Sequence, residues 1–151
     1  MREKLVAFGN DFVIETADRV PMFRVDGKAL RVRNTIQLTD QTGRPLYRVQ
    51  ERVVRLKETM VIERDGRTVA TIQKALVTPL RDRFEVQVVD GPPLQVRGNV
   101  VDHEYTVTRN GTPVATVSRR WFRMRDIYGV EIMAGEDHAF LLAIAAAIDS
   151  M

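Results

Sequence analysis

Residues 139–148, AFLLAIAAAI, form a run of ten residues without a polar side chain. A helix that crosses a bilayer needs about 20 apolar residues, so this run is too short to span one. Alanine and leucine favour helix, and a helix that is apolar all round is buried all round. Gly135 and an acidic first turn, with Glu136 and Asp137, indicate the start of a helix, because carboxylates there offset the positive end of the helix dipole. We therefore predict a helix over residues 137–149, about 20 Å long, that is buried in the protein's own core. The alternative is insertion into a membrane or docking on a partner.

The rest of the chain is predicted to form β-strands. Segments rich in Val, Ile, Thr, Phe and Tyr alternate with charged residues, and a period of two places one face of a strand on a core and the other in water. Turn pairs that tolerate the positive φ angles of tight hairpins separate these segments. About twelve strands are expected, which is many for one open sheet and favours a closed barrel or two packed sheets. The turn pairs are Asp26-Gly27, Thr42-Gly43, Asp65-Gly66, Asp90-Gly91 and Asn110-Gly111.

The chain contains an internal echo. Residues 62–74 (IERDGRTVATIQK) align with residues 107–119 (VTRNGTPVATVSR) at an offset of 45, and residues 38–50 form a fainter copy. The copies are too few and too unevenly spaced for a propeller or a solenoid, and no Pro/Ser-rich linker divides the chain. We therefore predict one domain, residues 1–151, with a mainly β fold. The predicted architecture is a closed antiparallel β-barrel of about twelve strands around a central C-terminal hydrophobic α-helix.

Five stretches of the sequence carry a family resemblance: MREKL at residues 1–5, FRVDGKAL at 23–30, RDRFEV at 81–86, DHEYTVTRNGTPVATVSRRWF at 102–122 and RDIYGVEIMAGEDHAFLLAIAAAID at 125–149. Through them the chain resembles, over nearly its whole length, the LURP-one-related family, whose members have the tubby C-terminal-like fold. The resemblance implies a barrel wrapped around the C-terminal helix. It implies little about activity, since many members have no assigned biochemical activity.

Relatives in the wider tubby-like fold suggest lipids as ligands. Tubby proteins bind phosphoinositide head groups, and phospholipid scramblases share the fold. The sequence has none of the three features that scramblases carry, which are an acidic calcium-binding segment, a cysteine-rich palmitoylated stretch and a Pro-rich N-terminal arm. The resemblance therefore favours binding of a head group over scrambling.

The inventory of reactive residues argues against an enzyme. Cysteine is absent, serine occurs only at Ser118 and Ser150, and histidine occurs only at His103 and His138. The sequence has no G-x-S-x-G, H-E-x-x-H, Walker A or G-x-G-x-x-G motif. The densest acid/base cluster, DHE at residues 102–104, is interpreted as a polar strand edge or loop, because on a strand its imidazole would point away from both carboxylates. We expect no catalytic residue, no metal site and no cofactor.

A basic stripe is the most suggestive feature for binding. Residues 118–126, SRRWFRMRD, contain four arginines and the only tryptophan. Alternate residues of an extended strand share one face. Arginine binds phosphate through two parallel hydrogen bonds, and tryptophan favours the head-group level of a bilayer. In the echo, Lys74 takes the place of Arg119, and further arginines follow it. The resulting candidate residues for a phosphate or head-group ligand are Arg119, Trp121, Arg123, Arg125, Lys74, Arg81 and Arg83.

Other interpretations of the stripe stay open. Its basic residues could pair with acidic residues on neighbouring strands, namely Asp82, Glu85, Asp126 and Glu131. Trp121 and its flanking arginines could also anchor a protein interface, since Trp and Arg dominate binding hot spots. Nucleic acid is not expected as a partner, because Asp and Glu are interspersed throughout and no RNP, KH or zinc pattern is present.

These observations predict a non-enzymatic binding module of the tubby-like class. It would engage an anionic phospholipid head group or a phosphorylated ligand through a basic strand face; the alternative is a protein-interaction or scaffold module. The net charge of +3 is only a weak attraction for anionic surfaces. The absence of cysteine fits a reducing cytoplasm, and the N-terminus has no secretory signal pattern or transmembrane segment. We expect a cytoplasmic protein that acts at the periphery of a membrane.

Overall fold

The computed structural model describes residues 2–8, 11–16, 20–26, 35–54, 57–75, 82–119 and 127–151. Within these ranges the chain forms twelve strands followed by one helix. The elements are β1 (Arg2–Phe8), β2 (Asp11–Thr16), β3 (Pro21–Asp26), β4 (Thr35–Asp40), β5 (Pro45–Val54), β6 (Lys57–Arg64), β7 (Arg67–Lys74), β8 (Asp82–Val88), β9 (Leu94–Asn99), β10 (Glu104–Arg109), β11 (Thr112–Ser118), β12 (Ile127–Ile132) and α1 (His138–Asp149).

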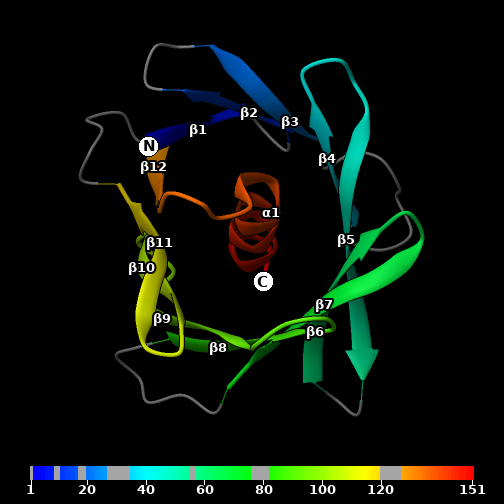
Figure 1. Ribbon diagram of the computed structural model, residues 1–151, viewed down its shortest axis with the longest axis vertical. Helices are drawn as coiled ribbons and strands as arrows, with labels where there is room; N and C mark the ends of the chain where they lie inside the picture. The colour runs from blue at the N-terminus through cyan, green and yellow to red at the C-terminus, as the bar shows by residue number, and fades with distance from the viewer. Residues whose placement is uncertain are drawn as a thin grey trace.

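All strand pairs are antiparallel, and each strand pairs with its neighbours in the sequence. β1 pairs with β2 on one side and with β12 on the other, where Leu5 lies opposite Ile14 and Tyr128, so the strand order is that of a closed barrel. Figure 1 shows α1 inside the ring of strands. The predicted mainly β, antiparallel fold with one C-terminal helix is confirmed.

The echoed segments form equivalent bulged hairpins. The two central residues of each turn, 65–66 and 110–111, have φ angles of 52° and 77°, and of 51° and 79°. Positive φ at both positions is what a two-residue hairpin turn requires. The strand register shifts at residues 62–63 and at the equivalent residues 107–108. The fainter copy shifts at the corresponding residues 38–39. Bulges increase the local twist of a strand pair, which helps the sheet to curve around α1.

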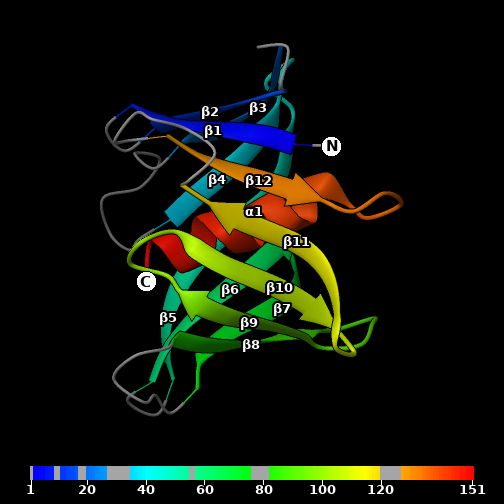
Figure 2. The ribbon, with the colours of Figure 1, turned by 90° about the vertical axis from the view of Figure 1, so that its left-hand side faces the viewer.

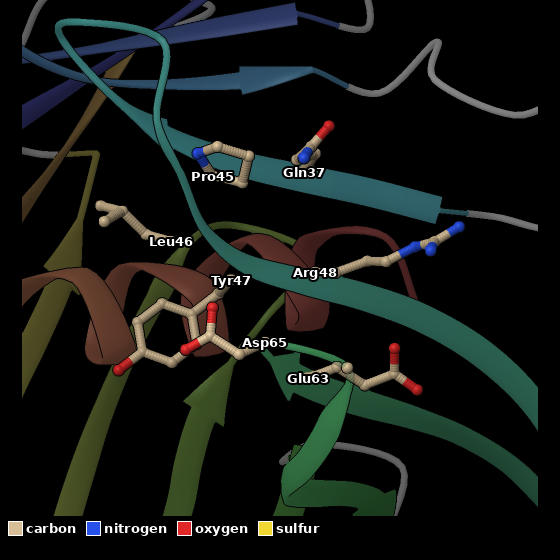
Figure 3. Close-up of a pocket in the computed structure, with 8 residues that line it drawn as sticks. Gln37, Pro45, Leu46, Tyr47, Arg48, Glu63 and Asp65 are labelled. Atoms are coloured by element: carbon tan, nitrogen blue, oxygen red, sulfur yellow. The ribbon is translucent and has the colours of Figure 1, made fainter.

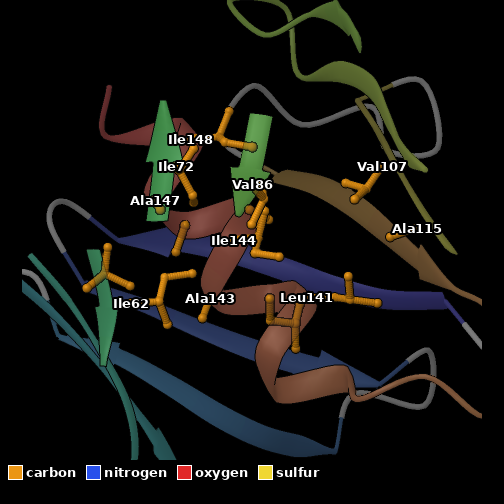
Figure 4. Packing of buried hydrophobic residues seen from close by; sticks show 14 of the residues in the cluster. Ile62, Ile72, Val86, Val107, Ala115, Leu141, Ala143, Ile144, Ala147 and Ile148 are labelled. Carbon is orange, nitrogen blue, oxygen red and sulfur yellow. The ribbon is translucent and has the colours of Figure 1, made fainter. Parts of the chain in front are cut away.

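The helix α1 fills the space that the sheet surrounds. Every residue from 141 to 148 is buried, and these side chains form one cluster with apolar residues from strands on all sides. Figure 4 shows Ile144 and Ala147 of α1 among Ile62, Ile72 and Val86 of the wall. The predicted burial of this helix is therefore confirmed. No helix in the described part of the chain is long and apolar enough to cross a membrane.

Asp137 holds the beginning of α1. Its Oδ1 accepts a hydrogen bond from the backbone N–H of Phe140 at 3.0 Å, which makes it the N-cap. Its Oδ2 accepts a hydrogen bond from the Tyr47 hydroxyl at 3.0 Å. Burial, and then the negative charge of Asp137, raise the pKa of Tyr47. Glu136 precedes the cap and accepts two hydrogen bonds from Arg109, at 2.7 and 2.9 Å. The expected acidic first turn is therefore wrong: the acidic residues lie just before the helix, where Asp137 caps it, and none lies in the first turn.

Replacement of Asp137 is expected to destabilise the protein moderately. Asp137→Ala removes the N-cap, which is worth about 1 kcal/mol, and leaves the partly buried Tyr47 hydroxyl without its acceptor, at about 1 kcal/mol more. Urea unfolding should show a free energy of unfolding lower by about 2 kcal/mol. Asp137→Asn keeps a capping oxygen and should lose less. An equal loss in both variants would contradict this assignment of the cap.

Candidate functional site

The structure describes three of the seven residues predicted to bind an anion. Lys74 ends β7, Arg83 lies in β8, and Arg119 directly follows β11. The other four lie outside the described residues: Arg81, Trp121, Arg123 and Arg125. The site can therefore be built from the strands β7 to β11.

Lys74 and Arg83 lie on opposite faces of the sheet. Lys74 is directly opposite Phe84, and directly opposed residues point to the same face. Because Phe84 is buried, that face is the inner one, and Arg83, its neighbour in β8, points outward. The Lys74 Nζ lies 3.5 Å from Asp82 Oδ1 and 5.7 Å from the centre of the Phe84 ring. Lys74 is thus the ion-pair partner of Asp82. Lys74 and Arg83 were expected to contribute to one basic surface, but the register places them on opposite faces.

Arg119 lies beside a carboxylate. Its backbone N–H donates a hydrogen bond to Glu104 Oε1 at 3.0 Å. The Ser118 hydroxyl donates to both oxygens of the same carboxylate, each at 2.9 Å. Glu104 therefore holds the end of β11 against β10 and places a negative charge at the start of the basic stripe.

Arg83 faces a second arginine that the sequence analysis missed. Arg97 in β9 lies directly opposite it, and both side chains are exposed on the outer face. Arg97 Nη2 donates a hydrogen bond to Gln95 Oε1 at 3.2 Å, whereas the Arg83 side chain makes no hydrogen bond or ion pair with any described residue. Like charges that are directly opposed repel, so this pair is an arrangement that a bound anion would stabilise. The alternation in LQVRG at residues 94–98, with Val96 inward, indicates that Arg97 points outward, and it could have identified this residue from the sequence.

One residue of the DHE cluster, His103, contacts the end of the helix. Residues 102 and 103 lie in the turn between β9 and β10, which confirms the interpretation as strand edge or loop. The His103 Nδ1 lies 3.0 Å from Asp149 Oδ1, at the end of α1. Burial, and then the charge of Asp149, raise the pKa of the neighbouring Tyr105. No three His, Asp or Glu side chains within the described ranges converge as metal ligands.

A shallow pocket lies on the opposite side of the barrel, over β4, β5 and β6. Its volume is about 200 Å³, and Figure 3 shows Tyr47 and Asp65 among the residues that line it. Glu63, another lining residue, is already bound by Arg52 at 3.0 Å. The lining carries charges of both signs, so it shows no preference for an anion. The lining residues are Gln37, Pro45, Leu46, Tyr47, Arg48, Glu63, Asp65 and Gly66.

Comparisons with known proteins agree with this fold. A family model described as LURP-one-related matches residues 1–149. A Bacillus subtilis (strain 168) protein named Uncharacterized protein YxjI is 27% identical over 149 residues, which make up 99% of this chain and 90% of that protein. The X-ray structure of a protein from Arabidopsis thaliana matches with a TM-score of 0.75 at 16% identity, over 99% of this chain and 89% of the other. At that identity, the structural likeness shows a shared fold.

Proposed function

Because the chain belongs to the LURP-one-related family, we propose that it is a non-enzymatic binding module, and that its ligand carries a phosphate group. The observation that supports this proposal is the exposed pair of Arg83 and Arg97 on the outer face of β8 and β9. In this proposal the protein acts in the cytoplasm, at the periphery of a membrane when the phosphate belongs to a lipid head group.

The geometry of the pair suits a phosphate. Directly opposed residues on antiparallel strands have Cβ atoms about 5 Å apart, so two guanidinium groups can reach oxygens of one phosphate. Each guanidinium can donate two parallel hydrogen bonds to an anion. An anion between the two side chains would also remove their mutual repulsion. Both lipid head groups and soluble phosphate esters present this chemistry.

Charge removal at the pair should weaken binding strongly. We expect Arg83→Gln/Arg97→Gln to reduce binding to phosphatidylserine-containing vesicles at least about tenfold, because charge-assisted hydrogen bonds contribute about 1.5–3 kcal/mol each. Co-sedimentation with neutral and phosphatidylserine-containing vesicles, at low and physiological salt, measures this. Titration with inorganic phosphate, monitored through backbone amide NMR shifts, tests whether the protein binds a soluble phosphate.

A matched control separates a specific site from net charge. Arg44→Gln/Arg67→Gln removes two exposed positive charges, one from the turn before β5 and one from the first residue of β7, and it should bind nearly as well as the unchanged protein. An equal loss of vesicle binding in both double variants would show that net charge, and not a specific site, causes the effect. No binding of vesicles or of inorganic phosphate under any condition would overturn the proposal.

A separate variant tests three arginines of the basic stripe. Arg119→Ala/Arg123→Ala/Arg125→Ala tests whether the stripe contributes to the same ligand. Head-group binding weakens as salt increases, because exposed charges are screened beyond about 10 Å at 0.1 M salt. If vesicle binding is absent and a protein partner binds independently of salt through Trp121, the protein-interaction alternative replaces this proposal.

A further inference from the structure

We propose that Thr106 and Thr116 extend the Arg83–Arg97 pair into a four-residue binding row, so that the ligand is a phosphate ester that also carries hydroxyl groups. This inference rests on the proposed function and names the chemical class of its ligand: a phosphorylated polyol. The row is defined here as Arg83, Arg97, Thr106 and Thr116.

The strand register places the row in one line. Arg83 lies opposite Arg97, Arg97 opposite Thr106, and Thr106 opposite Thr116. The four residues therefore stand on the consecutive strands β8, β9, β10 and β11 and share the outer face, because their chain neighbours Phe84, Val96, Tyr105 and Val117 are buried. With neighbouring strands about 4.8 Å apart, the row is about 14 Å long. Figure 2 shows these strands side by side with their outer face toward the viewer.

The two halves of the row offer different hydrogen-bonding chemistry. Arginine only donates, which matches the oxygens of a phosphate. A threonine hydroxyl both donates and accepts, which matches a ligand hydroxyl that does the same. Thr106 and Thr116 are half-buried, and neither hydroxyl makes a hydrogen bond within the described part of the chain. The threonines are thus open to a ligand that is held by the arginines.

Carboxylates border the row and limit the ligand to one phosphate. Glu131 lies opposite Thr116 on β12, and Glu85 and Glu104 flank the row two residues along β8 and β10. A second phosphate beside these side chains would be repelled, since like charges at such distances destabilise each other. Uncharged hydroxyl groups meet no such penalty. The row therefore favours a ligand with a single phosphate followed by hydroxyls.

The test compares two soluble probes of the same charge. Glycerol 3-phosphate and propyl phosphate have the same carbon count, but only the first carries hydroxyl groups. We expect glycerol 3-phosphate to bind at least about fivefold more tightly, which corresponds to one net hydrogen bond. Thr106→Val/Thr116→Val should remove this preference and leave the affinity for propyl phosphate unchanged. The matched control is Thr71→Val, on the outer face of β7 and away from the row. Backbone amide NMR titration measures all affinities.

Vesicles identify the source of the ligand. Phosphatidylglycerol, phosphatidylinositol and phosphatidylserine each carry one net negative charge, but only the first two present a polyol head group. Preferential binding to those two vesicles, lost in Thr106→Val/Thr116→Val, supports a lipid as the source, whereas the same preference seen only with glycerol 3-phosphate supports a soluble ligand. Equal binding of both soluble probes by the unchanged protein overturns this inference and leaves the proposed function standing. Failure of every probe, propyl phosphate included, overturns the proposed function itself.

Discussion

Ile144→Asp is expected to abolish the folded state. Ile144 is fully buried, with 0% of its side chain exposed, in the cluster that joins α1 to the surrounding strands. An unpaired carboxylate in such a place costs several kcal/mol, and the cavity left by the lost apolar atoms adds about 2 kcal/mol. The sum is comparable to the whole stability of a domain, about 5–15 kcal/mol. Far-UV circular dichroism and the dispersion of amide NMR signals should both report an unfolded or aggregated chain.

A conservative change at the same position is the control. Ile144→Val removes one methylene group and should cost only about 1 kcal/mol, with the fold intact. If Ile144→Asp is a well-folded, soluble protein that only fails to bind vesicles or a partner, then the helix is a docking element and its burial in the barrel is not needed for stability.

Gly98→Ala is expected to have the second largest effect. A Cβ atom at Gly98 would lie 2.4 Å from the Glu104 carbonyl oxygen and 2.7 Å from the Tyr105 Cα. Both are backbone atoms of the paired strand β10, so neither can move without disturbing the strand pair. Gly98 also has a φ of 145°, which L residues rarely adopt. We expect a loss of about 3 kcal/mol or more, measured as a lower midpoint of urea unfolding with an unchanged slope.

Gly43→Ala separates backbone strain from steric overlap. Gly43 has a positive φ of 87°, but a Cβ there would meet no atom within 4 Å. Its replacement should therefore cost only about 1 kcal/mol. A loss for Gly98→Ala no larger than that for Gly43→Ala would show that β9 and β10 do not approach each other as closely as described.

The main features of the fold could be predicted from short-range patterns. The ten apolar residues of 139–148 predicted a buried helix because no face of that helix could be placed in water. The Asp65-Gly66 and Asn110-Gly111 pairs predicted tight hairpins, and their φ angles are positive as such turns require. Asp137 was recognised at the start of the helix and is its cap. Its second bond, to Tyr47, joins residues 90 positions apart, and no local pattern indicates that partner.

The candidate site was predicted less well because faces were assigned without a register. The sequence pattern predicts that Lys74 and Arg83 belong to one basic surface, but Lys74 lies opposite the buried Phe84 and pairs with Asp82. Arg97 was not considered, although its outward direction follows from the buried residues on either side of it in alternation. A shift of one residue in pairing moves every side chain to the other face, so a charge pattern along one strand does not identify its partners.

The sequence by itself determined the local features: where the hairpins turn, and that residues 137–149 were expected to form a helix with no polar face over residues 139–148. Those features depend on the backbone φ angles that each residue tolerates and on the solvation of side chains a few residues apart. Both follow from the local sequence. Only the tertiary structure decided which charges meet. Arg83, Arg97, Thr106 and Thr116 come from four strands, and they form one row because the pairing register of the closed sheet sets both the face and the neighbours of each side chain.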